Sequence, residues 1–97
     1  MRAELNTGRG RLYRAGSEQY IVSVRYQINE DKTSKSANWW GELTPDESVK
    51  IDERDRHIIE LEDGRRGMCS LRKMVNRVVS GIPPRYSYHF TALSPLV

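Results

Sequence analysis

The residues of this chain that are best suited to chemistry are two histidines and one cysteine: His57, His89 and Cys69. No two of them lie at the short spacings that zinc sites use, so the sequence indicates no metal site. Each histidine falls in a segment typical of a β-strand, and both are expected as solvated strand residues. Cys69 falls on an apolar face, where cysteine behaves as a small hydrophobic residue rather than a nucleophile. The sequence therefore predicts no catalytic residue and no cofactor.

Acidic side chains gather in two predicted turns in the middle of the chain. They are Asp46, Glu47, Asp52, Glu53 and Asp55. Their spacing does not match the alternating ligands of a calcium-binding loop. Paired carboxylates act as acid and base only where a pocket shifts their pKa values. We expect solvated surface charges here, and an enzyme is the least favoured function.

The charges of the chain are distributed unevenly. Residues 1–38 hold seven basic and four acidic side chains, residues 39–63 hold three and nine, and residues 64–97 hold six and none. The net charge of +3 thus hides an acidic middle and a wholly basic last third. A basic surface suits a polyanion such as nucleic acid, but the two regions can also balance each other across a sheet.

Two adjacent tryptophans, Trp39 and Trp40, form the most informative pair in the sequence. Adjacent residues of a strand point to opposite faces, so the two rings cannot enter the same core. The alternation that leads to Leu43 predicts Trp39 inside and Trp40 outside. An exposed tryptophan can stack on a nucleic-acid base or anchor a protein interface.

The element that organises the chain is the segment 20–28, in which apolar and polar residues alternate almost without exception. This is the period of a half-buried strand. Further strands are expected at 8–14, 39–43, 57–61, 66–70 and 85–92. Asp63-Gly64 predicts a type I′ hairpin turn. From 71 to 79 the apolar residues recur every three or four positions, which predicts one short helix that Ser70 caps.

A chain of 97 residues has room for one domain with a modest core. The segment 1–7 is expected as a loose lead-in and the polar segment 29–38 as a mobile loop. Five or six antiparallel strands and one short helix indicate a mainly β fold, either a small barrel or a curled sheet, with the helix over one mouth. An open α+β sheet is the alternative. The expected core residues are Leu12, Tyr20, Val22, Val24, Tyr26, Ile28, Trp39, Leu43, Ile59, Leu61, Leu71, Val75, Tyr88 and Phe90.

These observations favour a non-enzymatic binding module that contacts nucleic acid or another polyanion through a basic face. The residues expected to bind are Arg9, Arg11, Tyr13, Trp40, Arg65, Arg66, Arg72, Lys73 and Arg77. The alternative is a protein-interaction or oligomerisation domain, in which acidic and basic surfaces meet around the exposed tryptophan. A continuous basic face favours the first hypothesis, and interleaved charges favour the second.

The single cysteine and the lack of a long apolar run in the sequence indicate the cellular compartment. One cysteine cannot form an internal disulfide, and no apolar segment is long enough to cross a bilayer. We therefore expect a cytoplasmic protein without a membrane partner.

Overall fold

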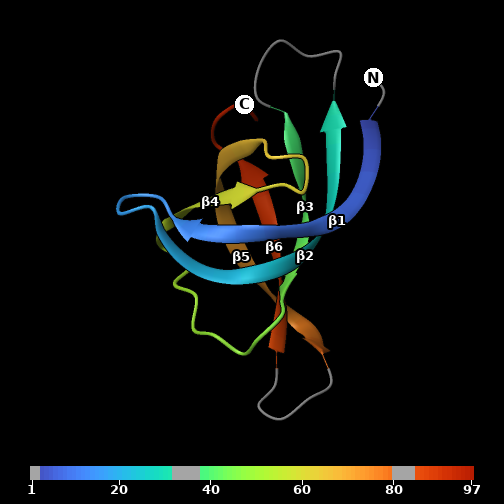
Figure 1. The fold of residues 1–97 in the computed structure, drawn as a ribbon. Helices are drawn as coiled ribbons and strands as arrows, with labels where there is room; N and C mark the ends of the chain where they lie inside the picture. The colour runs from blue at the N-terminus through green and yellow to red at the C-terminus, as the bar shows by residue number, and fades with distance from the viewer. Residues whose placement is uncertain (1–2, 32–37, 80–84) are drawn as a thin grey trace.

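The computed structural model of the chain describes residues 3–31, 38–79 and 85–97, with the backbone alone at 3, 75–79 and 85. Its strands are β1 (Ala3–Arg14), β2 (Gln19–Asp31), β3 (Trp39–Pro45), β4 (Arg56–Glu60), β5 (Arg66–Val79) and β6 (Arg85–Ala92). They form a closed antiparallel barrel in the order β1-β2-β3-β6-β5-β4 (Figure 1). The predicted mainly β barrel is confirmed.

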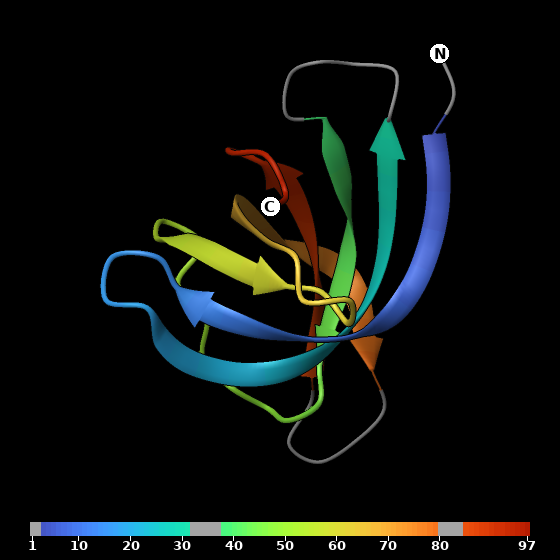
Figure 2. The ribbon, with the colours of Figure 1, turned by 45° about the horizontal axis from the view of Figure 1, so that its top comes forward.

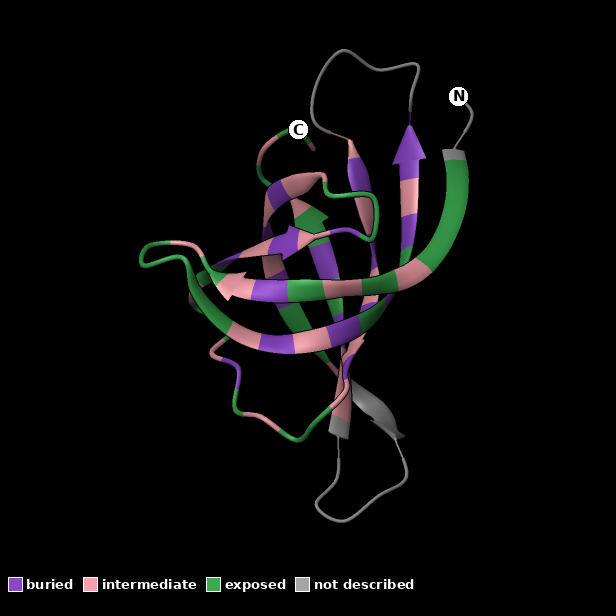
Figure 3. Cartoon of the chain, viewed as in Figure 1, coloured by how far each residue is buried: buried purple, intermediate pink, exposed green. Residues whose placement is uncertain are grey.

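Strand β2 shows how the alternating sequence forms one wall of the barrel. Val22, Val24, Tyr26 and Ile28 are buried, whereas the residues between them are partly or fully exposed (Figure 3). The rest of the expected core is buried as well, with one exception, wherever the structure describes the side chain. The side chain of Val75 lies outside the described residues.

Tyr20 is the exception, because its side chain is 52% exposed. In the register of β1 with β2, Leu12 pairs with Val22, but the next pair is Tyr13 with Tyr20. Ile21 is thus the extra residue of a bulge, and a bulge interrupts the alternation of a strand. Tyr20 lies on the outer face beside Tyr13, with the two ring centroids 5.9 Å apart.

The segment expected as a helix is the second half of a long strand, so that prediction is wrong. β5 runs from Arg66 to Val79, and Ser70, the expected helix cap, lies within it. β5 pairs with β6 on both sides of an irregularity between Lys73 and Val78. Hydrogen bonds to a neighbouring strand, together with the strand propensity of valine, outweigh the helical spacing of the apolar residues.

Two segments expected to be irregular belong in part to strands. β1 begins at Ala3, and its residues up to Thr7 pair with β2, so most of the expected lead-in is part of the barrel. β2 continues past Ile28 to Asp31. Residues 32–37 of the expected loop lie outside the described residues.

The turn between β4 and β5 differs in type from the expected one. Of its residues only Gly64 has a positive φ, of 93°, whereas a type I′ turn needs two such residues. The Gly64 N–H donates to the Leu61 carbonyl at 3.0 Å, and the Leu61 N–H donates to the Arg65 carbonyl at 2.8 Å. These bonds define a three-residue loop, in which a type I turn is followed by a left-handed glycine.

Glycines on two strands lie so close to interior aromatic rings that a side chain in their place would clash with the ring. A Cβ atom at Gly10 would lie 3.2 Å from the Tyr26 ring and 2.2 Å from the Glu60 carbonyl oxygen. At Gly67 it would lie 2.6 Å from the Trp39 ring. Small barrels have room for only a few large side chains, so a large residue on one strand faces a small one on another. The glycine-arginine run in β1 therefore has a packing role.

We expect the change Gly10→Ala to lower the free energy of unfolding by about 1–3 kcal/mol, because the new methyl group must displace backbone or ring atoms. Urea denaturation measures this loss. Gly16→Ala is the matched control, since no atom lies within 4 Å of a Cβ at that position. Equal losses in the two variants would contradict this account of the packing.

Candidate functional site

Three of the expected binding residues belong to one network of opposite charges on the barrel surface. Glu60 accepts a hydrogen bond from the Tyr13 hydroxyl at 3.2 Å and lies 3.7 Å from the Arg11 guanidinium. Arg66 lies 3.9 Å from Glu60 and 3.3 Å from Glu18, with its guanidinium 4.9 Å from the centroid of the Tyr13 ring. Basic and acidic side chains are therefore interleaved here.

Arg9 and Arg65 also have carboxylate partners. Arg9 lies 3.7 Å from Asp46. Arg65 forms a bidentate pair with the buried Glu30, at 2.7 and 3.0 Å, and a further contact with Asp63 at 2.9 Å. The hydrogen bonds with Glu30 raise the pKa of Arg65, opposed by its partial burial. Arg65 thus ties the turn between β4 and β5 to the end of β2.

The basic residues expected on one helical face are separated by the strand that replaces the helix. Arg72 points to the outer wall of the barrel, where its register partner on β6 is His89. Lys73 points the other way, with its ammonium 3.9 Å from the centroid of the Tyr86 ring. The side chain of Arg77 lies outside the described residues. Adjacent residues share a helix face more readily than a strand face, which is why the helical prediction grouped them.

The structure brings Trp40 and Arg72 together in one groove on the outer wall of β3, β6 and β5. We call it the wall groove, and its lining includes Trp40, Glu53, Arg54, Ser70, Arg72, His89 and Thr91. Its volume is about 930 Å³. In the sheet register Trp40 pairs with Thr91, and Thr91 pairs with Ser70. These outward residues come from strands far apart in the sequence, so alternation alone does not reveal that they meet.

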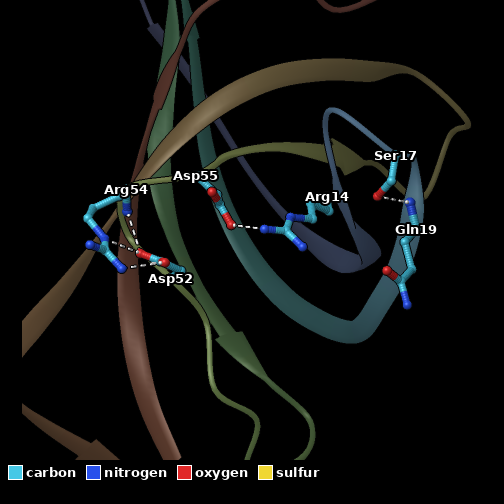
Figure 4. Close-up of polar contacts among 6 residues, drawn as sticks. All are labelled: Arg14, Ser17, Gln19, Asp52, Arg54 and Asp55. Carbon is cyan, nitrogen blue, oxygen red and sulfur yellow. Dashed lines mark hydrogen bonds and ion pairs between the residues drawn. The ribbon is translucent and has the colours of Figure 1, made fainter.

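In the wall groove, unlike around Glu60, one basic side chain has no carboxylate partner among the described residues. Arg72 is exposed and forms no ion pair with any residue that the structure describes. Arg54, at the rim, is held by Asp52, with its Nε and Nη2 at 3.1 and 3.0 Å from the carboxylate oxygens (Figure 4). The hydrogen bonds from Arg54 lower the pKa of Asp52 to about 2. Glu53 accepts a hydrogen bond from the backbone N–H of Lys73.

One of the two histidines is buried, contrary to expectation. His57 is 2% exposed, whereas His89 is exposed as predicted. His57 lines a pocket of about 370 Å³ beside Arg14 and Asp55, which form an ion pair at 2.9 Å (Figure 4). Its position two residues before the buried Ile59 was the signal for an inward side chain. Its Nδ1 atom has no hydrogen-bond partner among the described residues.

Burial shifts the pKa values of two interior groups, His57 and Cys69. Burial lowers the pKa of His57, although the nearby Asp55 opposes this shift. Burial raises the pKa of the Cys69 thiol to about 12, so that the thiolate is scarce near neutral pH. Cys69 is fully buried, as a core residue.

No group of three metal-ligating side chains occurs within residues 3–31, 38–79 and 85–97. Within the same ranges no helix is long and apolar enough to cross a membrane.

Neither a protein-family model, nor a curated protein, nor a solved structure matches this chain significantly. The function proposed below therefore rests on the geometry of this chain alone.

We expect the barrel to lose stability as the pH falls below about 6.5, the ordinary pKa of histidine. Because the folded His57 has a lowered pKa, the unfolded chain binds a proton that the folded chain does not, and acid favours unfolding. Urea denaturation at about pH 7.5 and about pH 5.5 measures the effect.

In His57→Asn the loss of stability between these two pH values should be smaller than in the native protein. His89→Asn is the matched control, because it removes an exposed histidine and leaves His57 in place. A pH dependence that is unchanged in His57→Asn would show that another group causes it.

Proposed function

We propose that this chain is a non-enzymatic binding module that binds single-stranded nucleic acid in the wall groove. Trp40 stacks on a base, and Arg72 pairs with a backbone phosphate. The observation that supports the proposal is that one groove holds an outward tryptophan and an arginine with no ion pair among the described residues. The expected phosphate contacts at Arg9, Arg11, Arg65 and Arg66 are not needed, because these arginines have carboxylate partners.

The composition of the groove supports a single strand rather than a duplex. An indole ring can stack on any base that is free of its own pairing, and such stacking contributes about 1–3 kcal/mol per base. Neighbouring strands of a sheet are about 4.8 Å apart, so the two spacings from β3 across β6 to β5 amount to about 10 Å. Arg72 lies two residues along β5 from Ser70, which is in the row of Trp40, and this adds about 7 Å along the strand. This span suits a short stretch of backbone between a stacked base and a bound phosphate.

The polar residues between these two anchors support the same ligand. Ser70, Thr91 and His89 present hydroxyl and imidazole groups that can hydrogen-bond to sugar, phosphate or base edges. Because the groove has few basic side chains, the affinity for nucleic acid should be moderate and few phosphates should be contacted.

A protein-interaction domain is the second candidate. The interleaved charges around Glu60 favour it, because alternating charges are better suited to a complementary protein surface than to a polyanion.

Arg72→Gln should weaken binding to a single-stranded oligonucleotide and reduce the dependence of log K on log[salt] by about 0.7, the value for one lost phosphate contact. Fluorescence anisotropy over a range of salt concentrations measures both quantities. Arg25→Gln is the matched control, because Arg25 is exposed on β2, outside the groove, and has no ion pair with a described residue. Equal effects at both positions would contradict a specific role for Arg72.

Trp40→Ala should lower the affinity by the loss of stacking, about 1–3 kcal/mol, while the salt dependence stays the same. This is expected because stacking releases few counterions. If the native protein binds no single-stranded DNA or RNA at low salt, the proposal is wrong.

A further inference from the structure

Among the described residues, strand β1 has a neighbour along its whole length on one side only. β2 pairs with β1 from Ala3 to Arg14, whereas β4 pairs only with Arg11 to Arg14. Figures 1 and 2 show the first half of β1 curving away from β4 beside β2. Among the described residues, no strand lies along the other side of this half.

The backbone of this half presents hydrogen-bonding groups to its open side. The Ala15 N–H donates to the Arg56 carbonyl at 3.0 Å, toward β4, and the Arg9 N–H donates to Glu62 at 3.3 Å, on the same side. Because successive N–H groups of a strand alternate in direction, those of Leu5 and Thr7 also point away from β2. Neither has a partner within the described residues. We call residues 5–9 the open edge.

A cleft of about 340 Å³ lies between the open edge and the turn from β4 to β5. The barrel residues Tyr26 and Ile28 line it, together with Glu62 and Asp63 of the turn. Arg65 is also present, but its guanidinium is engaged by Glu30 and Asp63. Glu4 of β1 and Glu30 of β2 also line the cleft, so its surface is mostly polar and acidic.

The side chains of the open edge are exposed. Leu5 is 54% exposed, and the first half of β1 forms the longest exposed stretch of strand in Figure 3. An exposed edge with free backbone groups and an apolar side chain is a template for pairing with another strand.

We propose that the open edge binds an extended, basic peptide segment of a partner protein as an additional β-strand. Its backbone would hydrogen-bond with Leu5 and Thr7, as in other cases of strand addition to a sheet edge. Alternate side chains of an added strand point to one face, so every second residue of the peptide would face the acidic cleft. Lysine or arginine residues would lie against Glu62 and Asp63.

A second copy of this chain fits the open edge less well than a basic peptide. Antiparallel pairing of two such edges would bring two acidic clefts together, which costs energy through like-charge repulsion. The one cation of the edge, Arg9, is already paired with Asp46. The proposal does not rest on nucleic-acid binding, because β2 separates the open edge from the wall groove.

The test uses a soluble synthetic peptide of alternating valine and lysine, with the matched valine–glutamate peptide as control. Amide hydrogen exchange of the full chain is followed by NMR. With the lysine peptide, the amides of Leu5 and Thr7 should exchange at least about tenfold more slowly, because each gains a hydrogen bond. The amides of Asn6 and Gly8 already face β2 and should change little.

Thr7→Pro should abolish peptide binding, because proline has no N–H to donate. The Thr7 N–H does not point to β2, so the pairing of β1 with β2 should survive, and a urea midpoint checks this. Glu62→Gln with Asp63→Asn is a second variant that leaves β1 unchanged. It should weaken binding of the lysine peptide, and it keeps the proposal testable if Thr7→Pro does not fold.

Three results would overturn the proposal. One is unchanged exchange of Leu5 and Thr7 in the presence of the lysine peptide. Another is equal binding of the glutamate peptide. The third is a native mass of two chains with these amides already protected, which would identify a second copy as the occupant. Oligonucleotide binding by Thr7→Pro should equal that of the native protein, so failure here is distinct from failure of the wall groove.

Discussion

The closed barrel depends on one short seam, in which β4 pairs with Arg11–Arg14 of β1. β4 is the shortest strand, with five residues, and its other neighbour is β5. The close approach of Gly10 to the Glu60 carbonyl lies directly beside this seam, so the absence of a side chain there is part of the closure. Because the seam is short, β1 and β4 separate beyond it. Among the residues that the structure describes, that separation leaves half of β1 without a second neighbour.

The seam also decides which charges are available to a partner. Glu60 is the last residue of β4, and closure brings it beside Arg11 on β1 and Arg66 on β5. Arg65 is held in the same way by the buried Glu30 at the end of β2. Exposed ion pairs contribute little to stability, but they do reduce the positive potential that a polyanion would meet. The carboxylates of the acidic middle thus pair mainly with arginines of the first third of the chain, and with Arg65 and Arg66 of the last third.

Two surfaces remain in which binding groups are not committed to the barrel itself. The wall groove offers an indole ring and an arginine with no ion pair in the described part of the chain. The open edge offers backbone groups beside an acidic cleft. The two surfaces suit different ligands, because one presents an aromatic face and the other presents main-chain donors and acceptors. The two proposed binding surfaces therefore lie on different strands of the same small barrel.

For the candidate site, the sequence predicted which way single side chains point, but not which of them lie together. Alternation put Trp39 inside and Trp40 on the other face of β3, where Trp40 is half-buried, and it grouped His89 with the polar residues of its strand. It could not show that Trp40, Thr91 and Ser70 lie in one row, because sheet register between distant segments leaves no periodic signal in the sequence. The helical spacing of apolar residues after Ser70 led to a wrong prediction, because it is a local pattern and contains no information about pairing with β6.

The sequence by itself determined the β class, the inward face of most strands and the position, though not the type, of the turn at Gly64, because these follow from side-chain alternation and local backbone preference. Only the tertiary structure decided the extent of β5, the outward turn of Tyr20 and the burial of His57. It also decided which arginines meet carboxylates and which do not. These features arise from pairing and closure between strands that are distant in the chain, and the free energy of such pairing depends on neighbours that no local pattern specifies.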